Sequence, residues 1–478
     1  MPTDPQTRPD QPALKRALGL SALIIYGIVL IQPTAPMSLY GAAAVEGKGH
    51  VVTAILIGMV AMLFTAISYG RMANAYPSAG SAYAYVSREI HPALGYFVGW
   101  SIIFDYVMNP IICVVWISGA VLDVATKLGW IHFSDTETLV GVIVLMVALT
   151  ALFTGLNLRG IEASARTNTL IAGGLGLIVL LFFGAALKYL MANPVHGGEL
   201  VRPFYDPQTF SVSTVFHGAS LAVLTYIGFD GISTLSEEAK NPRRNILVAT
   251  VLTCLVIGIL AALQVYFAQL IWPGTDFPNQ DTAFCDIAGK AGGAWLGLTV
   301  SLALILANFG SGAGAQLGAG RLLYSMGRDN AIPQKFFGAV DPRTRIPGNN
   351  ILLVGGIMLV GALTLKLIQA FEKVNAFDFG CQLLNFGALF AFMGVNVCAF
   401  IHYVLRHRDA SAWKIIGSVI APTIGFGVCA FLWINLSKPA IVVGLCWLAT
   451  GIAYGAWRTA GFTKPIRFAN VDEKPADS

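Results

Sequence analysis

The sequence predicts an all-α polytopic membrane protein with twelve transmembrane helices. Of its 478 residues, 56% are hydrophobic and only 12% are charged, whereas soluble domains carry roughly 25% charged residues. Twelve apolar segments each approach or exceed the ~20 residues that cross ~30 Å of hydrocarbon. They cover residues 18–40, 50–69, 93–122, 138–156, 168–190, 212–235, 246–271, 293–319, 350–368, 376–404, 413–434 and 439–457.

The basic residues predict how the chain is oriented. If the N-terminus is cytoplasmic, 22 of the 30 Lys and Arg residues lie on the inner side, as the positive-inside rule requires. We therefore expect both ends inside an inner (plasma) membrane, with cytoplasmic tails at 1–17 and 458–478. Residues 18–404 are expected to form the functional core. Residues 405–457 are expected to form two peripheral helices that face lipid or build a homodimer.

Several classes of function have no signal in the sequence. The net charge of +5 needs no nucleic-acid partner to explain it, because the location of the basic residues matters more than their excess. No HExxH motif, CxxC pair, nucleophile–base pair or metal cluster is visible. We therefore expect no enzymatic activity, cofactor or metal. The expected partners are membrane lipid and a small-molecule substrate.

The first span is interrupted in its middle. Pro33 and Pro36 lack a backbone donor and clash with the preceding turn. We expect the helix to break here, with Gln32 and Thr34 as substrate contacts. The alternative is a proline kink that the neighbouring helices tolerate.

The sixth span carries an acidic residue between two glycines. Gly228 and Gly231 weaken the helix. Asp230 is costly in hydrocarbon unless it faces a cavity or a partner. It is also a favoured N-cap for the half-helix that follows, and the two roles are compatible.

Two broken spans that lie five apart suggest two five-helix repeats of opposite orientation, with the site at their interface. This inference depends on hydropathy, since the sequence shows no convincing internal identity. Tyr226 and Phe229 flank the sixth break and are candidate substrate contacts. Glu237 lies at the cytoplasmic end of this span and is a candidate gating residue.

The third span carries a carboxyl group near the middle of the membrane. Asp105 follows Leu94 by eleven residues, about 16 Å at ~1.5 Å per residue. Asn109 lies one turn later on the same face, and Pro110 frees the carbonyl of Tyr106. These residues indicate a cation site. The alternative is an aspartate satisfied by hydroxyls or amides of neighbouring helices.

Two further segments have a predicted role. In span eight, Gly310, Gly314 and Gly318 recur every fourth residue and predict close helix packing. Asn308 in the same span is a candidate substrate contact. Residues 71–92 are too polar to cross the membrane and predict a short amphipathic helix at the cytoplasmic surface, with a gating or packing role.

Three motifs resemble the amino acid–polyamine–organocation (APC) transporters. They are YPSAGSAYAYVSREIHPALGYFVGW (Tyr76–Trp100), YIGFDGISTLSEEAKNPRRNI (Tyr226–Ile246) and GRLLYSMGRDNAIP (Gly320–Pro333). Within that superfamily the chain is most similar to putrescine-importer-type members. The resemblance implies a LeuT-like inverted-repeat fold, with a five-plus-five core and two extra spans. It also implies alternating access, driven by a proton gradient or by exchange.

The chain departs from the amino-acid members at two places. Those members usually break the first span at a glycine-rich sequence whose N–H groups hold the substrate carboxylate. Here Gln32–Pro36 takes that place, and two prolines withdraw two donors. Some members carry a coupling lysine in span five, where this chain is apolar near Leu175.

Together these observations favour an importer of an organic amine, with a polyamine such as putrescine as first choice. Asp105 and Asp230 can each neutralise one ammonium group of a diamine. Tyr226, Phe229 or Trp116 can offer a ring face to it. The expected coupling ion is a proton, released by one of the two aspartates. The alternative is an amino acid permease or an amine/amino acid exchanger of the same fold.

Overall fold

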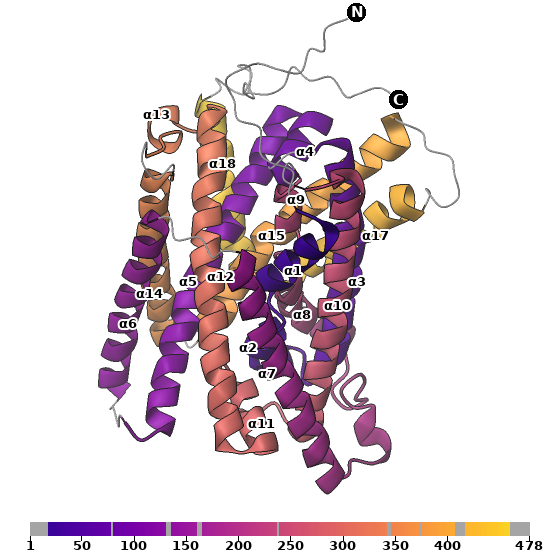
Figure 1. Cartoon of the computed structure of the whole chain (residues 1–478), viewed down its shortest axis with the longest axis vertical. Helices are drawn as coiled ribbons and strands as arrows, with labels where there is room; N and C mark the ends of the chain where they lie inside the picture. Colours follow the sequence, from indigo (N-terminus) through magenta and orange to yellow (C-terminus); the bar gives the residue numbers. More distant parts are fainter. Residues whose placement is uncertain are drawn as a thin grey trace, which may run out of the picture.

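The computed structural model describes residues 18–77, 80–130, 135–159, 165–236, 239–341, 346–372, 374–406 and 416–458. Apart from one isolated bridge between Leu18 and Ala239, the regular structure in these ranges is helical (Figure 1). The helices are α1 (Leu20–Ile31), α2 (Ala35–Glu46), α3 (Val51–Ala75), α4 (Ser81–Glu89), α5 (Pro92–Lys127), α6 (Asp135–Leu158), α7 (Ala165–Ala192), η1 (Gly197–Leu200), α8 (Val212–Ala222), η2 (Val223–Tyr226), α9 (Gly231–Thr234), α10 (Pro242–Ile271), α11 (Ala283–Gly292), α12 (Ala294–Arg328), α13 (Gln334–Phe337), α14 (Gly348–Glu372), α15 (Ala376–Phe400), η3 (Ile401–Arg406), η4 (Ile416–Ile420), α17 (Ala421–Ile434) and α18 (Lys438–Arg458).

The prediction of a helical multi-span membrane protein is confirmed. Eleven helices in the described ranges are long and apolar enough to cross a membrane, and α1 with α2 makes a twelfth crossing bent by 42°. The predicted segments match these helices, although α12 continues past the predicted end at 319 to Arg328. The short helix α11 was not predicted, because it is too short to register as a span.

The long helices run side by side, with α4 and α13 at one end of the bundle and α11 at the other (Figure 1). The carbonyl of Leu18 accepts a hydrogen bond from Lys240 N, just before α10 begins. Arg458 Nη2 donates to Asn330 Oδ1, just after α12 ends. The described chain therefore begins and ends at the same end, together with α4 and α13. We call this end the terminal face, and the opposite end, where α11 lies, the far face.

The first crossing is broken where its prolines predict. Helix α1 ends at Ile31, Gln32 adopts a φ of 69°, and α2 begins at Ala35. Neighbouring helices hold this break in place. Gln264 Nε2 of α10 donates to the carbonyl of Pro33 at 3.0 Å, which replaces a hydrogen bond that an unbroken helix would supply.

The sixth crossing is also interrupted, at residues 227–230. Helix α8 passes into the 3₁₀ turn η2, and Gly228 then takes a φ of 120° before α9 resumes at Gly231. A Cβ added at Gly228 would lie 3.2 Å from the carbonyl oxygen of Leu30, near the end of α1. The two breaks are therefore in direct contact, and this contact requires a residue without a side chain.

The predicted glycine face of α12 packs only in part. A Cβ at Gly310 or Gly314 would meet nothing within 4 Å, so the prediction of close packing is wrong at these two positions. At Gly318 a Cβ would lie 2.6 Å from the ring of Tyr106. The helix turns its first two glycines outward, because 3.6 residues per turn rotates an every-fourth-residue row around the axis.

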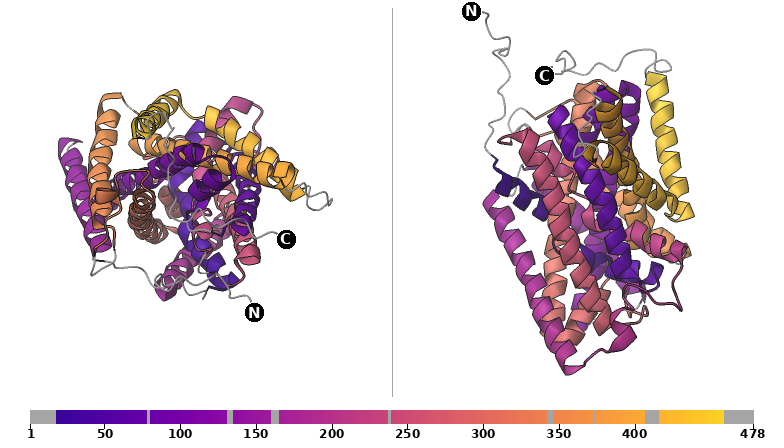
Figure 2. Two further views of the ribbon diagram at one scale, coloured as in Figure 1. Left: turned by 90° about the horizontal axis from the view of Figure 1, so that it is seen from above. Right: turned by 90° about the vertical axis from the view of Figure 1, so that its right-hand side faces the viewer.

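The last two crossings differ in how they join the bundle. Helix α17 packs against α3 and α15. Helix α18 stands on the outside (Figure 2). It is fixed to α5 by a reciprocal pair of hydrogen bonds, in which the indole of Trp100 donates to the carbonyl of Trp447 and the indole of Trp447 donates to that of Trp100.

Candidate functional site

Asp105 lies in the middle of α5 and is buried against α15, with only 5% of its surface exposed. Gly387 makes this approach possible. A Cβ there would lie 2.7 Å from the carbonyl oxygen of Ser101 and 3.0 Å from Asp105 N. In the described part of the chain, the carboxyl group of Asp105 has no hydrogen-bond or ion-pair partner. The described residues thus offer none of the hydroxyl or amide partners that the alternative reading of Asp105 requires.

Asp230 stands in the second break and is 6% exposed. It occupies the N-cap position of α9 but makes no side-chain cap hydrogen bond. The backbone N–H groups of Gly228 and Gly231 face its carboxyl group. Asp230 and Asp105 lie within electrostatic range of each other. The third and sixth crossings therefore bring two carboxyl groups to one place.

Aromatic side chains surround these two acids. The ring of Phe229 meets Tyr69 of α3 edge-on, with ring centroids 5.4 Å apart, and Phe392 of α15 at 5.2 Å. Tyr106, which packs on Gly318, is in electrostatic range of both aspartates. Sequence reasoning missed Tyr69, Tyr106 and Phe392 as site residues, since only the fold brings α3 and α15 to the break.

Beside the acids, a polar network joins α2, α5 and α12. Asn109 Oδ1 accepts hydrogen bonds from the Ser311 hydroxyl at 3.4 Å and the Cys113 thiol at 3.5 Å. Asn308 Nδ2 donates to Ser38 Oγ at 3.2 Å. Both predicted amides are only partly buried. The structure thus places Asn109 and Asn308 in one network next to the first break.

Three other residues predicted to contact the substrate are buried between helices. Gln32 Nε2 donates to the carbonyl of Ala307 at 2.7 Å and so ties the first break to α12. The Tyr226 hydroxyl donates to the carbonyl of Ile55 at 2.8 Å, and its side chain is fully buried between α3 and α10. Thr34 is fully buried, and its hydroxyl has no partner among the described residues. Gln32 and Tyr226 therefore position helices.

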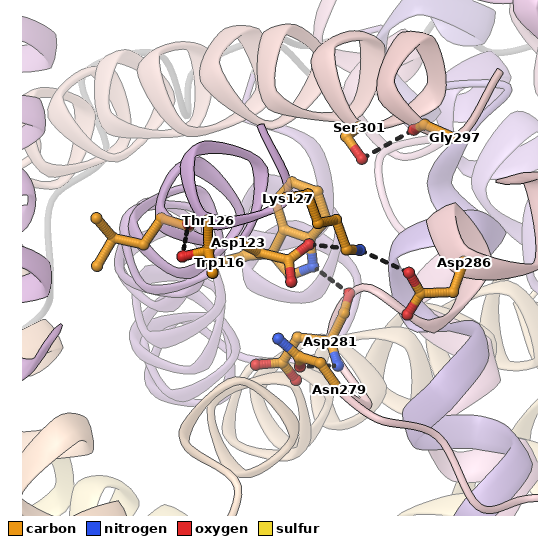
Figure 3. A network of polar contacts seen from close by, with 10 residues as sticks. Trp116, Asp123, Thr126, Lys127, Asn279, Asp281, Asp286, Gly297 and Ser301 are labelled. Carbon is orange, nitrogen blue, oxygen red and sulfur yellow. Dashed lines mark hydrogen bonds and ion pairs between the residues drawn. The ribbon is translucent and has the colours of Figure 1, made fainter. Parts of the chain in front are cut away.

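Trp116 lies in a polar cluster with Asp123, Lys127, Asp281 and Asp286 (Figure 3). Its indole donates to the carbonyl of Asp281 at 3.0 Å. Close by, Lys127 forms ion pairs with Asp123 at 2.8 Å and Asp286 at 2.5 Å. Eleven residues of helix, roughly 16 Å, separate Trp116 from Asp105. Trp116 therefore offers no ring face to a ligand held by Asp105.

A further buried acid, Glu89, was not predicted and lies at the terminal face. Glu89 of α4 is fully buried, and its Oε2 accepts hydrogen bonds from the Tyr76 hydroxyl at 2.8 Å and His402 Nδ1 at 2.7 Å. Arg406 Nη1 lies 3.0 Å from Oε1. Burial by itself would raise the pKa of Glu89, but these partners outweigh it and lower the pKa below its usual value. This cluster docks α4 onto α3 and η3. The predicted gate residue Glu237 lies outside the described residues.

One hollow between the helices is apolar and lies away from the two acids. It is an apolar groove of ≈ 580 Å³ between α3, α8 and α17. It is lined by Thr53, Leu56, Ile57, Val60, Phe216, Gly427, Val428 and Phe431. None of the predicted site residues lines it. Asp105 and Asp230 are instead nearly fully buried within the bundle.

Comparison with known proteins places these features in context. A family model described as amino acid permease matches residues 23–463. The chain is 34% identical to the low-affinity putrescine importer PlaP of Escherichia coli (strain K12) over 95% of this chain and 96% of that protein. It is 27% identical to the branched-chain amino acid permease BcaP of Bacillus subtilis (strain 168), over 92% of each chain. The methylthioribose transporter of the same strain is 25% identical, again over 92% of each.

Proposed function

The chain belongs to the amino acid permease family of the APC superfamily, and on that premise we propose that it imports an organic amine, putrescine being the first candidate. This is a multi-pass membrane transporter of amines or amino acids, and it is not an enzyme.

One observation carries the proposal. Asp105 and Asp230 are both nearly fully buried, they lie within electrostatic range of each other, and no described cation pairs with either. Two buried carboxylates without cations are costly. A diamine brings two ammonium groups and no carboxylate, so it offsets both charges. The aromatic rings of Phe229, Tyr69 and Phe392 provide the apolar wall that its methylene chain and ammonium groups prefer.

The proposal extends to how the substrate moves. Crossings one to five and six to ten form two inverted repeats around the touching breaks, and the two repeats rock about this site in alternating access. Both ends of the chain lie in the cytoplasm of a cell with an inner membrane. A proton is the coupling ion, carried by Asp105 or Asp230, since the segment near Leu175, where the resemblance implies a lysine in some family members, is apolar.

Uptake into proteoliposomes tests the proposal. We expect radiolabelled putrescine to accumulate when the lumen is more alkaline than the outside, and accumulation to fall at least tenfold in Asp105→Asn and in Asp230→Asn. Ser101→Ala, which alters a neighbouring α5 hydroxyl bonded to α15, serves as the control for packing. Unchanged uptake in Asp105→Asn would remove that residue from the mechanism. Uptake that ignores the pH gradient would remove the proton.

The rival function is amino acid transport. The similarity to BcaP over 92% of each chain favours it, whereas the two prolines near the first break weaken a carboxylate grip. Competition decides between them. Inhibition of uptake by branched-chain amino acids, but not by diamines, would overturn the amine proposal and leave the family assignment intact.

A further inference from the structure

One buried hydroxyl near the breaks, that of Tyr69, makes no hydrogen bond with the described residues. Tyr69 of α3 is fully buried, and its hydroxyl has no hydrogen-bond partner among the described residues. A phenol can both donate and accept, and leaving it unpaired in the interior carries a free-energy cost. Phe would fill the same space without this cost.

Tyr69 lies next to the second break. Its ring meets Phe229 edge-on, with centroids 5.4 Å apart, and Phe392 at 5.7 Å. Phe229 directly precedes Asp230 in the second break. The hydroxyl lies within electrostatic range of both Asp230 and Asp105. The unpaired group is therefore at the site where a cation would be held.

Three tyrosines of the bundle provide a comparison. Tyr226 is just as buried, but its hydroxyl donates to the carbonyl of Ile55. Tyr40 of α2 is also buried with an unpaired hydroxyl, but it packs between Phe277 and Phe284 near the far face. Among these three, only Tyr69 has an unpaired hydroxyl that also lies near both carboxyl groups of the site.

We propose that Tyr69 is a substrate-binding residue whose hydroxyl hydrogen-bonds to an N–H group of a primary alkylammonium. In the loaded state its hydroxyl accepts a hydrogen bond from the ammonium group and donates its own proton to the carboxylate of Asp230. The inference deepens the proposed function and depends on it. It adds a hydrogen-bonding group from α3 beside the two carboxyl groups that the third and sixth crossings supply.

The test compares three Tyr→Phe variants in purified protein. Tyr69→Phe removes a hydroxyl that has no partner in the closed state, so its thermal unfolding temperature should equal or exceed that of the wild type. Its KM for putrescine uptake should rise about tenfold, as expected for a lost hydrogen bond to a charged group. Tyr40→Phe should match the wild type in both readouts to within about twofold in KM. Tyr226→Phe should unfold at a lower temperature.

The outcomes separate this inference from the function beneath it. If Tyr69→Phe keeps the wild-type KM while Asp105→Asn and Asp230→Asn lose uptake, Tyr69 is not a ligand and the proposed function stands. If Tyr40→Phe raises the KM equally, or Tyr69→Phe unfolds as early as Tyr226→Phe, the hydroxyl has a structural role and the inference fails. If the wild type carries no amine, the proposed function fails and the inference with it.

Discussion

The buried acid at the terminal face allows a local and quantitative prediction. Glu89→Gln keeps the size and shape of the side chain but removes its charge. The two hydrogen bonds to Oε2, from Tyr76 at 2.8 Å and His402 at 2.7 Å, become neutral ones. A hydrogen bond to a charged group stabilises by ~1.5–3 kcal/mol and a neutral one by ~0.5–1.5. The loss over both bonds is therefore about 2 kcal/mol.

The ion pair with Arg406 adds little to this figure. The Arg406 side chain is 52% exposed, so solvent screening limits its contribution to well under ~1 kcal/mol. A loss of about 2 kcal/mol should increase the population of the undocked α4 roughly 30-fold. Hydrogen–deuterium exchange over residues 80–90, read by mass spectrometry in detergent, measures this opening directly. Arg88→Gln is the matched control, because Arg88 is the next residue on the same helix and is exposed.

The pH dependence has a definite sign. Because the pKa of Glu89 is lowered in the folded protein, its stabilisation is complete above the unfolded pKa of ~4.3. It is lost as the pH falls through the lower folded value. Protection of α4, corrected for intrinsic exchange, should therefore not change with the titration of Glu89 between pH 8 and 5, and it should decline in stronger acid. If residues 80–90 of Glu89→Gln exchange within twofold of the wild-type rate, the charge of Glu89 does not stabilise the docking of α4.

Three further predictions concern the breaks and the α5–α15 contact. Gly387→Ala should lower the unfolding temperature, at a cost of ~1–3 kcal/mol, because its Cβ would lie 2.7 Å from the Ser101 carbonyl oxygen. Gly310→Ala is the control, because a Cβ there would meet nothing within 4 Å. Equal unfolding temperatures of the two variants would contradict the close α5–α15 contact. Gln264→Leu should lower the free energy of unfolding by ~1–3 kcal/mol and reduce uptake, since it leaves the Pro33 carbonyl unpaired. An unchanged unfolding temperature would mean that the first break is stable without this hydrogen bond. Gly228→Ala should cost ~1–3 kcal/mol in backbone strain at its φ of 120°, and full uptake by this variant would show that the break tolerates another geometry.

Much of the fold could be predicted from local sequence, because membrane crossing depends on local hydrophobicity. The apolar segments give the helices, and Pro33 with Gly228 gives the breaks. These features act within a few residues of the chain: a missing donor, a missing side chain or an unbroken apolar run. Helix α11 was missed because it is too short to register as a span, and the last turns of α12, up to Arg328, were missed because they are too polar to be part of an apolar run.

The site could be predicted only in part. Asp105 and Asp230 were recognisable since a carboxyl group in hydrocarbon is unusual in itself. Tyr226 and Tyr69 could not be told apart, because which tyrosine faces the acids depends on helix rotation and on partners far away in sequence. The same holds for Glu89 and His402, which meet across 313 residues.

The contact between the two breaks constrains how the transporter can move. The backbone at Gly228 rests against Leu30, and a Cβ at Gly231 would lie only 2.2 Å from a methyl carbon of the same leucine. With so little clearance, α1 cannot move closer to this segment without displacing the residues beside Asp230. Any rearrangement that narrows the gap between the two discontinuities therefore has to move both of them together.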